Sequence, residues 1–182
     1  MLSVLFVDIR GFTSLAEKTS PTDIALQLHR FYDLASKAIF GQDGTLDKLV
    51  GDQVMAFFGP PLNHEDHARR AVTTALEIRR AISEFAPTDT LAIGVGITTG
   101  EAFVGNVGGA DVTDYTVLGD TVNVAARLES EALSGEILIS QQTYDRVADD
   151  FPHATRRELL LKGKSERVIA WQIAATIATP DS

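Results

Sequence analysis

The sequence contains no cysteine, which excludes disulfide bonds and thiolate metal sites. It also contains no run of about 18 apolar residues, so no transmembrane helix is expected. The first residues lack the basic region of a signal peptide, and the chain meets an acid at Asp8. These absences predict a cytoplasmic domain that does not itself contact a membrane. The same expectation holds whether the longer protein is a soluble or a membrane-attached sensor.

Basic residues are also scarce, since 16 Lys and Arg stand against 25 Asp and Glu, for a net charge of −9. This balance argues against binding to nucleic acid or an anionic membrane. The chain has 182 residues, 45% of them hydrophobic, which suits one domain with a substantial core. Periodicity fades at 174–182, which reads as a tail or linker. Because an apolar strand starts almost at once, at Val4–Val7, we expect a domain of a longer protein with an upstream regulatory domain.

Two common sequence signals are absent or fail. No Walker GxxxxGK[ST] motif occurs, and Gly94, Gly96 and Gly100 do not fit GxGxxG. His64 and His67 stand three apart but lack a well-placed third ligand, so we interpret them as surface residues and not as a metal pair.

The segment Leu46–Gly59 is predicted to form two strands joined by a Gly51-Asp52 turn. Its apolar flanks suggest a buried hairpin, where a carboxylate is costly unless a cation or hydrogen-bond donors meet it. Asp is also a common turn residue, so Asp52 could be an ordinary turn tip. A second acid, Asp8, ends the continuous apolar run Leu2–Ile9, which predicts a central strand covered on both faces.

If these two strands pair, Asp8 and Asp52 converge. Two oxygen ligands without nearby His or Cys suit Mg²⁺ or Mn²⁺, which bind carboxylates together with substrate phosphate. A turn at Gly11, opening a short helix around Ser14–Lys18, would offer backbone N–H groups to that phosphate. The residues alone therefore indicate metal-assisted phosphoryl chemistry on a nucleotide-like anion.

The remaining periodicities predict helices and strands in alternation. Asn123 and Arg127 share one face of a helix that Asp120 would cap; a solvated polar stripe is the plain alternative. The expected order gives an α+β fold with a mixed, mostly antiparallel sheet and helices packed on it. The expected helices are 20–41, 65–85, 120–128 and 141–149, and the expected strand pairs and strands are 91–100 with 101–107, 114–118, 136–140, and 155–161 with 167–173.

Three motifs, in order, resemble the class III adenylate and guanylate cyclase catalytic domain. They are Phe6-Val7-Asp8-Ile9-Arg10-Gly11-Phe12-Thr13, Lys48-Leu49-Val50-Gly51-Asp52, and the run from Leu118 to Arg127. The resemblance covers about Ser3 to Ile173. It implies a ferredoxin-like core, a cyclase catalytic domain at 1–173, and conversion of ATP to 3′,5′-cyclic AMP and pyrophosphate with two divalent cations, Mg²⁺ or Mn²⁺.

The resemblance also implies a role for each matching residue. The metal ligands would be Asp8, Asp52 and the carbonyl of Ile9. The other matching positions would hold the nucleotide: Gly11, Phe12 and Thr13 at the β and γ phosphates, Lys48 and Thr116 at the base, Asn123 at the ribose, Arg127 at the α phosphate in the transition state, and Lys162 at the terminal phosphates.

The base-reading positions favour ATP. A Lys48 donor suits the N1 acceptor of adenine, whereas guanylate members of the family carry Glu there. Thr116 stands where many members have Asp and resembles a bicarbonate-responsive subgroup, so bicarbonate stimulation is a hypothesis. Glu136 stands where some members have a basic residue, which gives Lys162 a larger share of phosphate binding.

The resemblance further implies a head-to-tail homodimer with shared active sites. One subunit would supply the metal ligands Asp8 and Asp52. The other would supply Lys48, Thr116, Asn123, Arg127 and Lys162. Two alternatives are a catalytically silent nucleotide-sensing module and a guanylate cyclase. The first is disfavoured because both acids, Asn123 and Arg127 are all present, and the second is disfavoured by Lys48.

Overall fold

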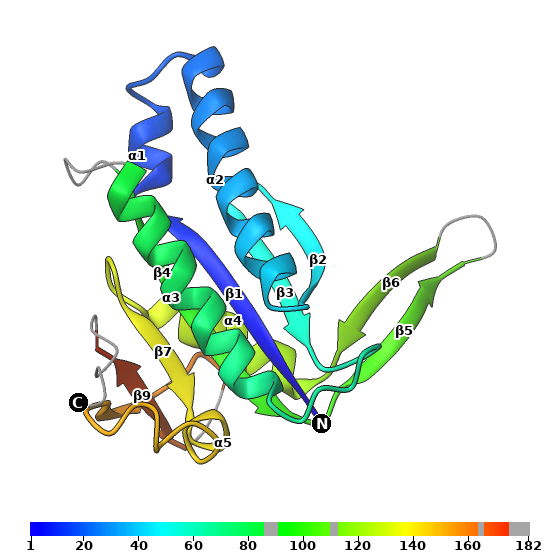
Figure 1. Cartoon of the computed structure of the whole chain (residues 1–182). Helices are drawn as coiled ribbons and strands as arrows, with labels where there is room; N and C mark the ends of the chain where they lie inside the picture. Colours follow the sequence, from blue (N-terminus) through cyan, green and yellow to red (C-terminus); the bar gives the residue numbers. More distant parts are fainter. Residues whose placement is uncertain (86–90, 110–112, 164–165, 175–182) are drawn as a thin grey trace.

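The computed structural model describes residues 1–85, 91–109, 113–163 and 166–174. In this part of the chain a seven-stranded sheet carries α2 and α3 on one face and α4 on the other (Figure 1). The elements in order are β1 (Leu2–Arg10), α1 (Phe12–Ala16), α2 (Pro21–Gly41), β2 (Thr45–Val50), β3 (Gln53–Phe58), α3 (His67–Phe85), β4 (Ala92–Gly100), β5 (Phe103–Gly108), β6 (Thr113–Leu118), α4 (Asp120–Glu131), β7 (Ile137–Ser140), α5 (Gln141–Tyr144), β8 (Thr155–Leu159) and β9 (Val168–Ile173).

The strands of the main sheet lie in the order β2-β3-β1-β4-β7-β9-β8. The β4–β7 pair is parallel, and the other neighbours in this sheet are antiparallel. The expected α+β fold with a mixed, mostly antiparallel sheet is therefore confirmed. None of the helices in the described ranges combines the length and the hydropathy that a membrane span requires.

Strand β1 is the central strand that its continuous apolar run predicts. Leu5, Val7 and Ile9 point to the core beneath α2 and α3, whereas Val4 and Phe6 point to the core beneath α4. Because successive strand residues face opposite sides, a strand covered twice must be apolar at nearly every position. The next residue on the α4 side of β1 is Asp8, so the fold directs this acid toward α4.

The partners of strand β4 differ from those expected, since it was predicted to form a hairpin with the segment that follows it. It pairs with β1 and β7, whereas β5 pairs with β6 in a separate two-stranded hairpin. The expected pairing of 91–100 with 101–107 was wrong because adjacency in sequence favours a hairpin, whereas β4 is buried along its length and fills the sheet centre. Gly96 lets α4 approach β4 closely, since a Cβ there would collide with the backbone of Ala125 and Glu129.

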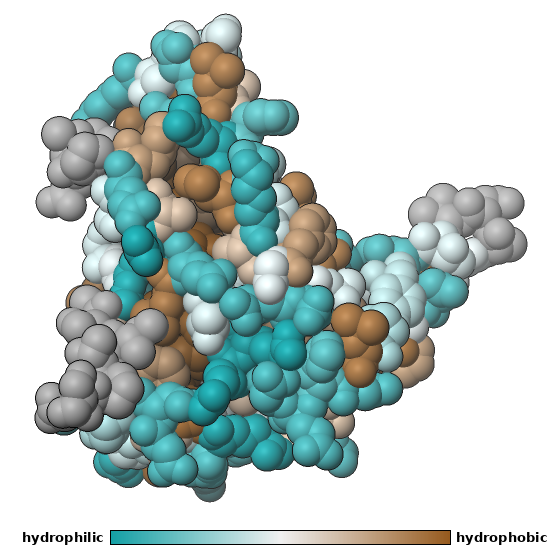
Figure 2. Space-filling model, in the orientation of Figure 1, coloured by the Kyte–Doolittle hydropathy of each residue, from teal (hydrophilic) through white to brown (hydrophobic). Residues whose placement is uncertain are grey.

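The β5–β6 hairpin projects from the body of the domain, and Figure 2 shows hydrophobic side chains near its base. Phe103, Tyr115 and Leu118 are each exposed there.

Three smaller expectations also needed correction. Gly119, and not Asp120, is the N-cap of α4, so Asp120 is the first helical residue. Helix α5 ends at Tyr144, five residues before the expected end. His67 is buried, and its Nδ1 lies 2.9 Å from Ser3 Oγ, because the first turn of α3 faces the start of β1. A buried imidazole needs such a partner.

Candidate active site

Asp8 and Asp52 meet at one end of the sheet. The β1–β3 register sets Asp8 opposite Gln53, which brings the turn between β2 and β3 beside the end of β1. The Ile9 N–H donates to the Asp52 carbonyl at 3.3 Å, and Asp52 contributes to the raised pKa of the Asp8 carboxyl. The two acids thus converge as their strand ends predict. The hairpin is less buried than expected, because β2 is an edge strand that leaves Leu49 and Val50 exposed.

A third acid and one arginine complete this cluster. Burial first, and then the charges of Glu129 and Asp52, raise the pKa of Asp8 to about 7 against the lowering effect of Arg10. Arg10 Nη1 donates to Asp8 at 3.0 Å, and Arg10 Nη2 lies 2.7 Å from Glu129 Oε1. Gln53 Nε2 donates to the other oxygen of Glu129 at 2.9 Å. Arg10 therefore pairs with two of the three carboxyl groups, those of Asp8 and Glu129.

Arg10 and Glu129 were not among the candidates from the sequence. Glu129 is buried on α4, and burial raises its pKa above the ordinary value although Arg10 and Gln53 oppose the shift. It lies on the same helical stripe as Val122 and Ala125, which pack on the sheet. An acid on an apolar stripe was the signal in the sequence that could have identified it.

The residues expected to hold phosphates lie next to the acid pair in the chain. Gly11 has a left-handed φ of 72° and caps α1, so the helix starts two residues before the expected Ser14. Gly11 and Thr13 are exposed and Phe12 is half-buried. Their role in phosphate binding remains a prediction.

Lys48 and Thr116 are brought together from strands far apart in the sequence. Lys48 Nζ lies 3.1 Å from Thr116 Oγ1, and it also donates to Asp47 at 2.7 Å and to Asp114 at 2.5 Å. The hydrogen bonds to Asp114 and Asp47 raise the pKa of Lys48. Thr116 is buried on β6, while the Lys48 side chain is 39% exposed. This pairing is the one that the resemblance implies for base recognition.

Arg127, Asn123 and the Lys162 turn lie on the outer side of α4. Asn123 is exposed and Arg127 is half-buried, one helical turn apart. A Cβ at Gly163 would lie 3.4 Å from Arg127 Nη2, so the turn that carries Lys162 lies against the arginine. Lys162 itself is exposed.

Helix α4 separates this group from the acid cluster. Arg127 and Glu129 are roughly 200° apart around the helix, at 3.6 residues per turn. Glu129 points to β1 and β3, where it meets Arg10 and Gln53. Arg127 therefore points away from the Asp8 side of its own chain.

The sequence matches the family described as the adenylate and guanylate cyclase catalytic domain over residues 1–175. The chain belongs to this family. The match covers all the residues discussed above.

Known proteins similar to this cyclase domain include both adenylate cyclases and guanylate cyclases. An adenylate cyclase from Mycobacterium bovis is 34% identical over 164 residues, which are 89% of this chain and 37% of that protein. The chain thus spans little more than a third of this relative's length.

Two solved structures share the fold closely. The adenylyl cyclase CyaB from P. aeruginosa has a TM-score of 0.85 and 37% identity, covering 95% of this chain and 93% of that one. The guanylyl cyclase Cya2 has a TM-score of 0.90 and 33% identity, covering 98% and 93%. The expected cyclase fold is therefore confirmed.

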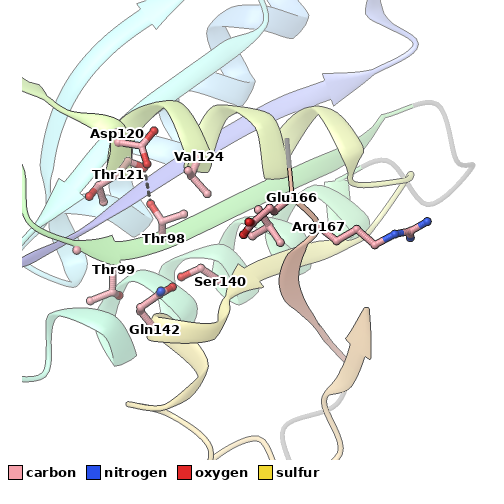
Figure 3. Close-up of a pocket in the computed structure, with 11 residues that line it drawn as sticks. Thr98, Thr99, Asp120, Thr121, Val124, Ser140, Gln142, Glu166 and Arg167 are labelled. Atoms are coloured by element: carbon pink, nitrogen blue, oxygen red, sulfur yellow. Dashed lines mark hydrogen bonds between the residues drawn. The ribbon is translucent and has the colours of Figure 1, made fainter. Parts of the chain in front are cut away.

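A cavity of about 470 Å³ lies beside the start of α4 in this cyclase domain (Figure 3). Thr98 on its wall donates to the Thr121 carbonyl at 2.7 Å. None of the expected nucleotide or metal residues is among those that line this cavity. Among the residues expected to bind nucleotide, Gly11, Thr13, Asn123 and Lys162 are exposed, whereas Thr116 is buried.

Proposed function

We propose that this domain is an adenylate cyclase, which converts ATP to 3′,5′-cyclic AMP and pyrophosphate. The observation that carries the proposal is the contact between Lys48 and Thr116. A lysine donates to the N1 acceptor of adenine, whereas the guanine edge offers an N1–H donor and suits a carboxylate. The similar proteins named adenylate cyclases support this choice.

Asp8 and Asp52 are proposed to hold divalent cations, Mg²⁺ or Mn²⁺. Asp8, Asp52 and Glu129 stand against a single arginine, and burial together with the charges of Glu129 and Asp52 raises the pKa of Asp8, which supports a site that a cation would stabilise. Within the described ranges, no three His, Cys, Asp or Glu side chains are placed so that they could hold a metal ion by themselves. Two carboxylates, the Ile9 carbonyl, phosphate and water would suffice for these ions. When bound, such ions stabilise the attacking and leaving oxygens of an in-line displacement.

The other residues act on the nucleotide. The ATP 3′-hydroxyl loses its proton to water, and its oxygen forms a bond to the α phosphorus. The bond from that phosphorus to the oxygen shared with the β phosphate breaks, and pyrophosphate leaves. Arg127 is a fixed, always-charged donor suited to the α-phosphate oxygens as charge grows on them. Asn123 would orient the ribose. Lys162 and the N–H groups after Gly11 would hold the terminal phosphates.

The placement of these groups supports a head-to-tail homodimer. Because Arg127 and Glu129 lie on opposite faces of α4, one chain does not direct Arg127 at its own Asp8 and Asp52. A second copy would present its Asn123 and Arg127 to the first chain's acids. The same exchange gives two equal sites, since each chain has both sets.

We assign this catalytic domain to residues 1–173, preceded by a regulatory domain in the whole protein.

The guanylate cyclase Cya2 keeps GTP as the second candidate substrate. Product identification separates the candidates. The domain is incubated with Mn²⁺ and either ATP or GTP, and the product is identified by mass spectrometry, with Asp52→Asn as the control. Cyclic AMP from ATP that disappears in the control supports the proposal. Cyclic GTP as the main product would favour a guanylate cyclase, and no cyclic product would favour a silent nucleotide-sensing module.

A further inference from the structure

A bulge in β2 puts two neighbouring side chains on the same side of the sheet. Leu46 pairs with Ala56 and Lys48 pairs with Met55, so Asp47 is the extra residue in the register. Neighbours in a regular strand point to opposite faces, but a bulge re-aims a side chain. Here Asp47 and Lys48 both reach Thr116 on β6.

The Asp47 carboxylate is fully buried and collects donors from two strands. It lies 2.8 and 3.0 Å from Thr116 Oγ1, 3.1 Å from the Val117 backbone nitrogen, and 2.7 Å from Lys48 Nζ. Its side chain has no exposed surface. An ionised carboxylate only accepts hydrogen bonds, so the hydroxyl hydrogen of Thr116 points to Asp47.

This contact decides what Thr116 can offer to a ligand. A hydroxyl has one hydrogen and two acceptor lone pairs. The hydrogen goes to Asp47, and one lone pair accepts from Lys48 at 3.1 Å. The second lone pair is left for an incoming donor. The three N–H groups of Lys48 meet Asp47, Asp114 and Thr116, so the lysine would reach a ring-nitrogen acceptor by releasing its contact with the exposed Asp114.

We infer that Asp47 is a specificity-determining positioning residue, which fixes the Thr116 hydroxyl as an acceptor and so selects a base with an amino donor next to a ring acceptor. Adenine presents its N6 amino group and N1 in this arrangement, whereas guanine presents the O6 acceptor and N1–H. The inference rests on the proposed function, because it concerns the same base site. Asp47 acts through Thr116 and Lys48 and needs no contact with the substrate.

The chain offers a matched control for this inference. Asp114 also pairs with Lys48, at 2.5 Å, but its side chain is 56% exposed, and it is Asp47 that accepts the hydrogen bond of Thr116. Removing the Asp114 charge therefore perturbs the lysine without releasing the threonine. In Asp47→Asn the new amide can donate to Thr116, which frees the hydroxyl to donate toward a guanine O6.

The test compares kcat/KM for ATP and GTP in the full chain with Mn²⁺. We expect Asp47→Asn to lower the ATP/GTP ratio about tenfold, as for the loss of one hydrogen bond, and Asp114→Asn to keep it within about twofold. In a Thr116→Val background, Asp47→Asn should change the ratio no further. An unchanged ratio in Asp47→Asn, or the full effect persisting in Thr116→Val, overturns the inference.

Variants of Thr116 test the same hydroxyl group without changing Asp47. If Asp47→Asn fails to fold in thermal melts, Thr116→Val is compared with Thr116→Ser, which keeps the hydroxyl. We expect a ratio about tenfold lower in the valine variant, and equal ratios would refute the role of the hydroxyl. If the wild type turns over neither nucleotide, the proposed function fails, and the ratio of ATP to GTP dissociation constants then tests Asp47 on its own.

Discussion

The acid cluster makes a quantitative prediction about the metal-free domain. Asp8 has a pKa of about 7 instead of 3.8, chiefly because it is buried and then because it faces Glu129 and Asp52. Asp8→Asn keeps the shape and an acceptor for Arg10, but it removes the ionised form. The variant should therefore be more stable than the wild type at high pH.

The raised pKa of Asp8 sets both the direction and the size of this change in stability with pH. A carboxyl group with a raised folded-state pKa contributes stability below pH 3.8, and this contribution is lost as the pH rises through about 7. A shift of about three pKa units corresponds to roughly 4 kcal/mol. Because the Asp8 side chain is 21% exposed, partial hydration reduces this to about 2–4 kcal/mol. The free energy of unfolding of Asp8→Asn minus that of the wild type should therefore be about 2–4 kcal/mol larger at pH 8.5 than near pH 4.

Urea unfolding of the metal-free domain with EDTA, at one protein concentration from pH 4 to 8.5, measures this difference. Asp33→Asn is the control, because Asp33 is exposed on α2 and its hydrogen bond to Lys37 lowers its pKa. It should show no gain at high pH. If the difference between Asp8→Asn and wild type does not change with pH, the reasoning about the acid cluster is refuted.

Three other predictions test the nucleotide side of the site and its assembly. Arg127→Ala should lower kcat by about 10²–10³ with a smaller change in KM, because the guanidinium acts on charge that grows in the transition state; Ser130→Ala, one turn further along α4, should leave kcat near the wild-type value, and an Arg127 effect below tenfold would contradict the assigned role. Specific activity with Mn²⁺–ATP should fall as the protein is diluted, and activity proportional to concentration down to nanomolar protein would argue against a weak dimer. Bicarbonate at fixed pH should stimulate cyclic AMP formation if Thr116 places the domain in the bicarbonate-responsive subgroup; a rate that ignores bicarbonate but follows Mg²⁺ removes that hypothesis.

Local patterns in the sequence predicted much of the architecture. The continuous apolar run predicted β1 as a doubly covered strand, and the acids at two strand ends predicted the meeting of Asp8 and Asp52. The pairing of Lys48 with Thr116 came from the family resemblance, since no local pattern relates positions 68 residues apart.

The features that were not predicted depend on tertiary contacts. The alternation of a regular strand does not predict where Asp47 points, because the bulge in β2 turns its side chain to the other face. Amino-acid composition gives no sign of such a one-residue shift in register. Glu129 and Arg10 pair across 119 positions. The partners of β4 depend on which strands bury both faces in the sheet, and adjacency in sequence favoured the wrong hairpin.

We propose that each active site combines the acids of one chain with the outer face of α4 from another. The most direct test mixes Asp8→Ala and Arg127→Ala, each inactive alone, in equal amounts. Half of the dimers would then be mixed, each with one intact site of two, so the mixture should recover about one quarter of wild-type activity with Mn²⁺–ATP. A mixture that stays as inactive as its components, although mixed dimers form, would contradict shared sites.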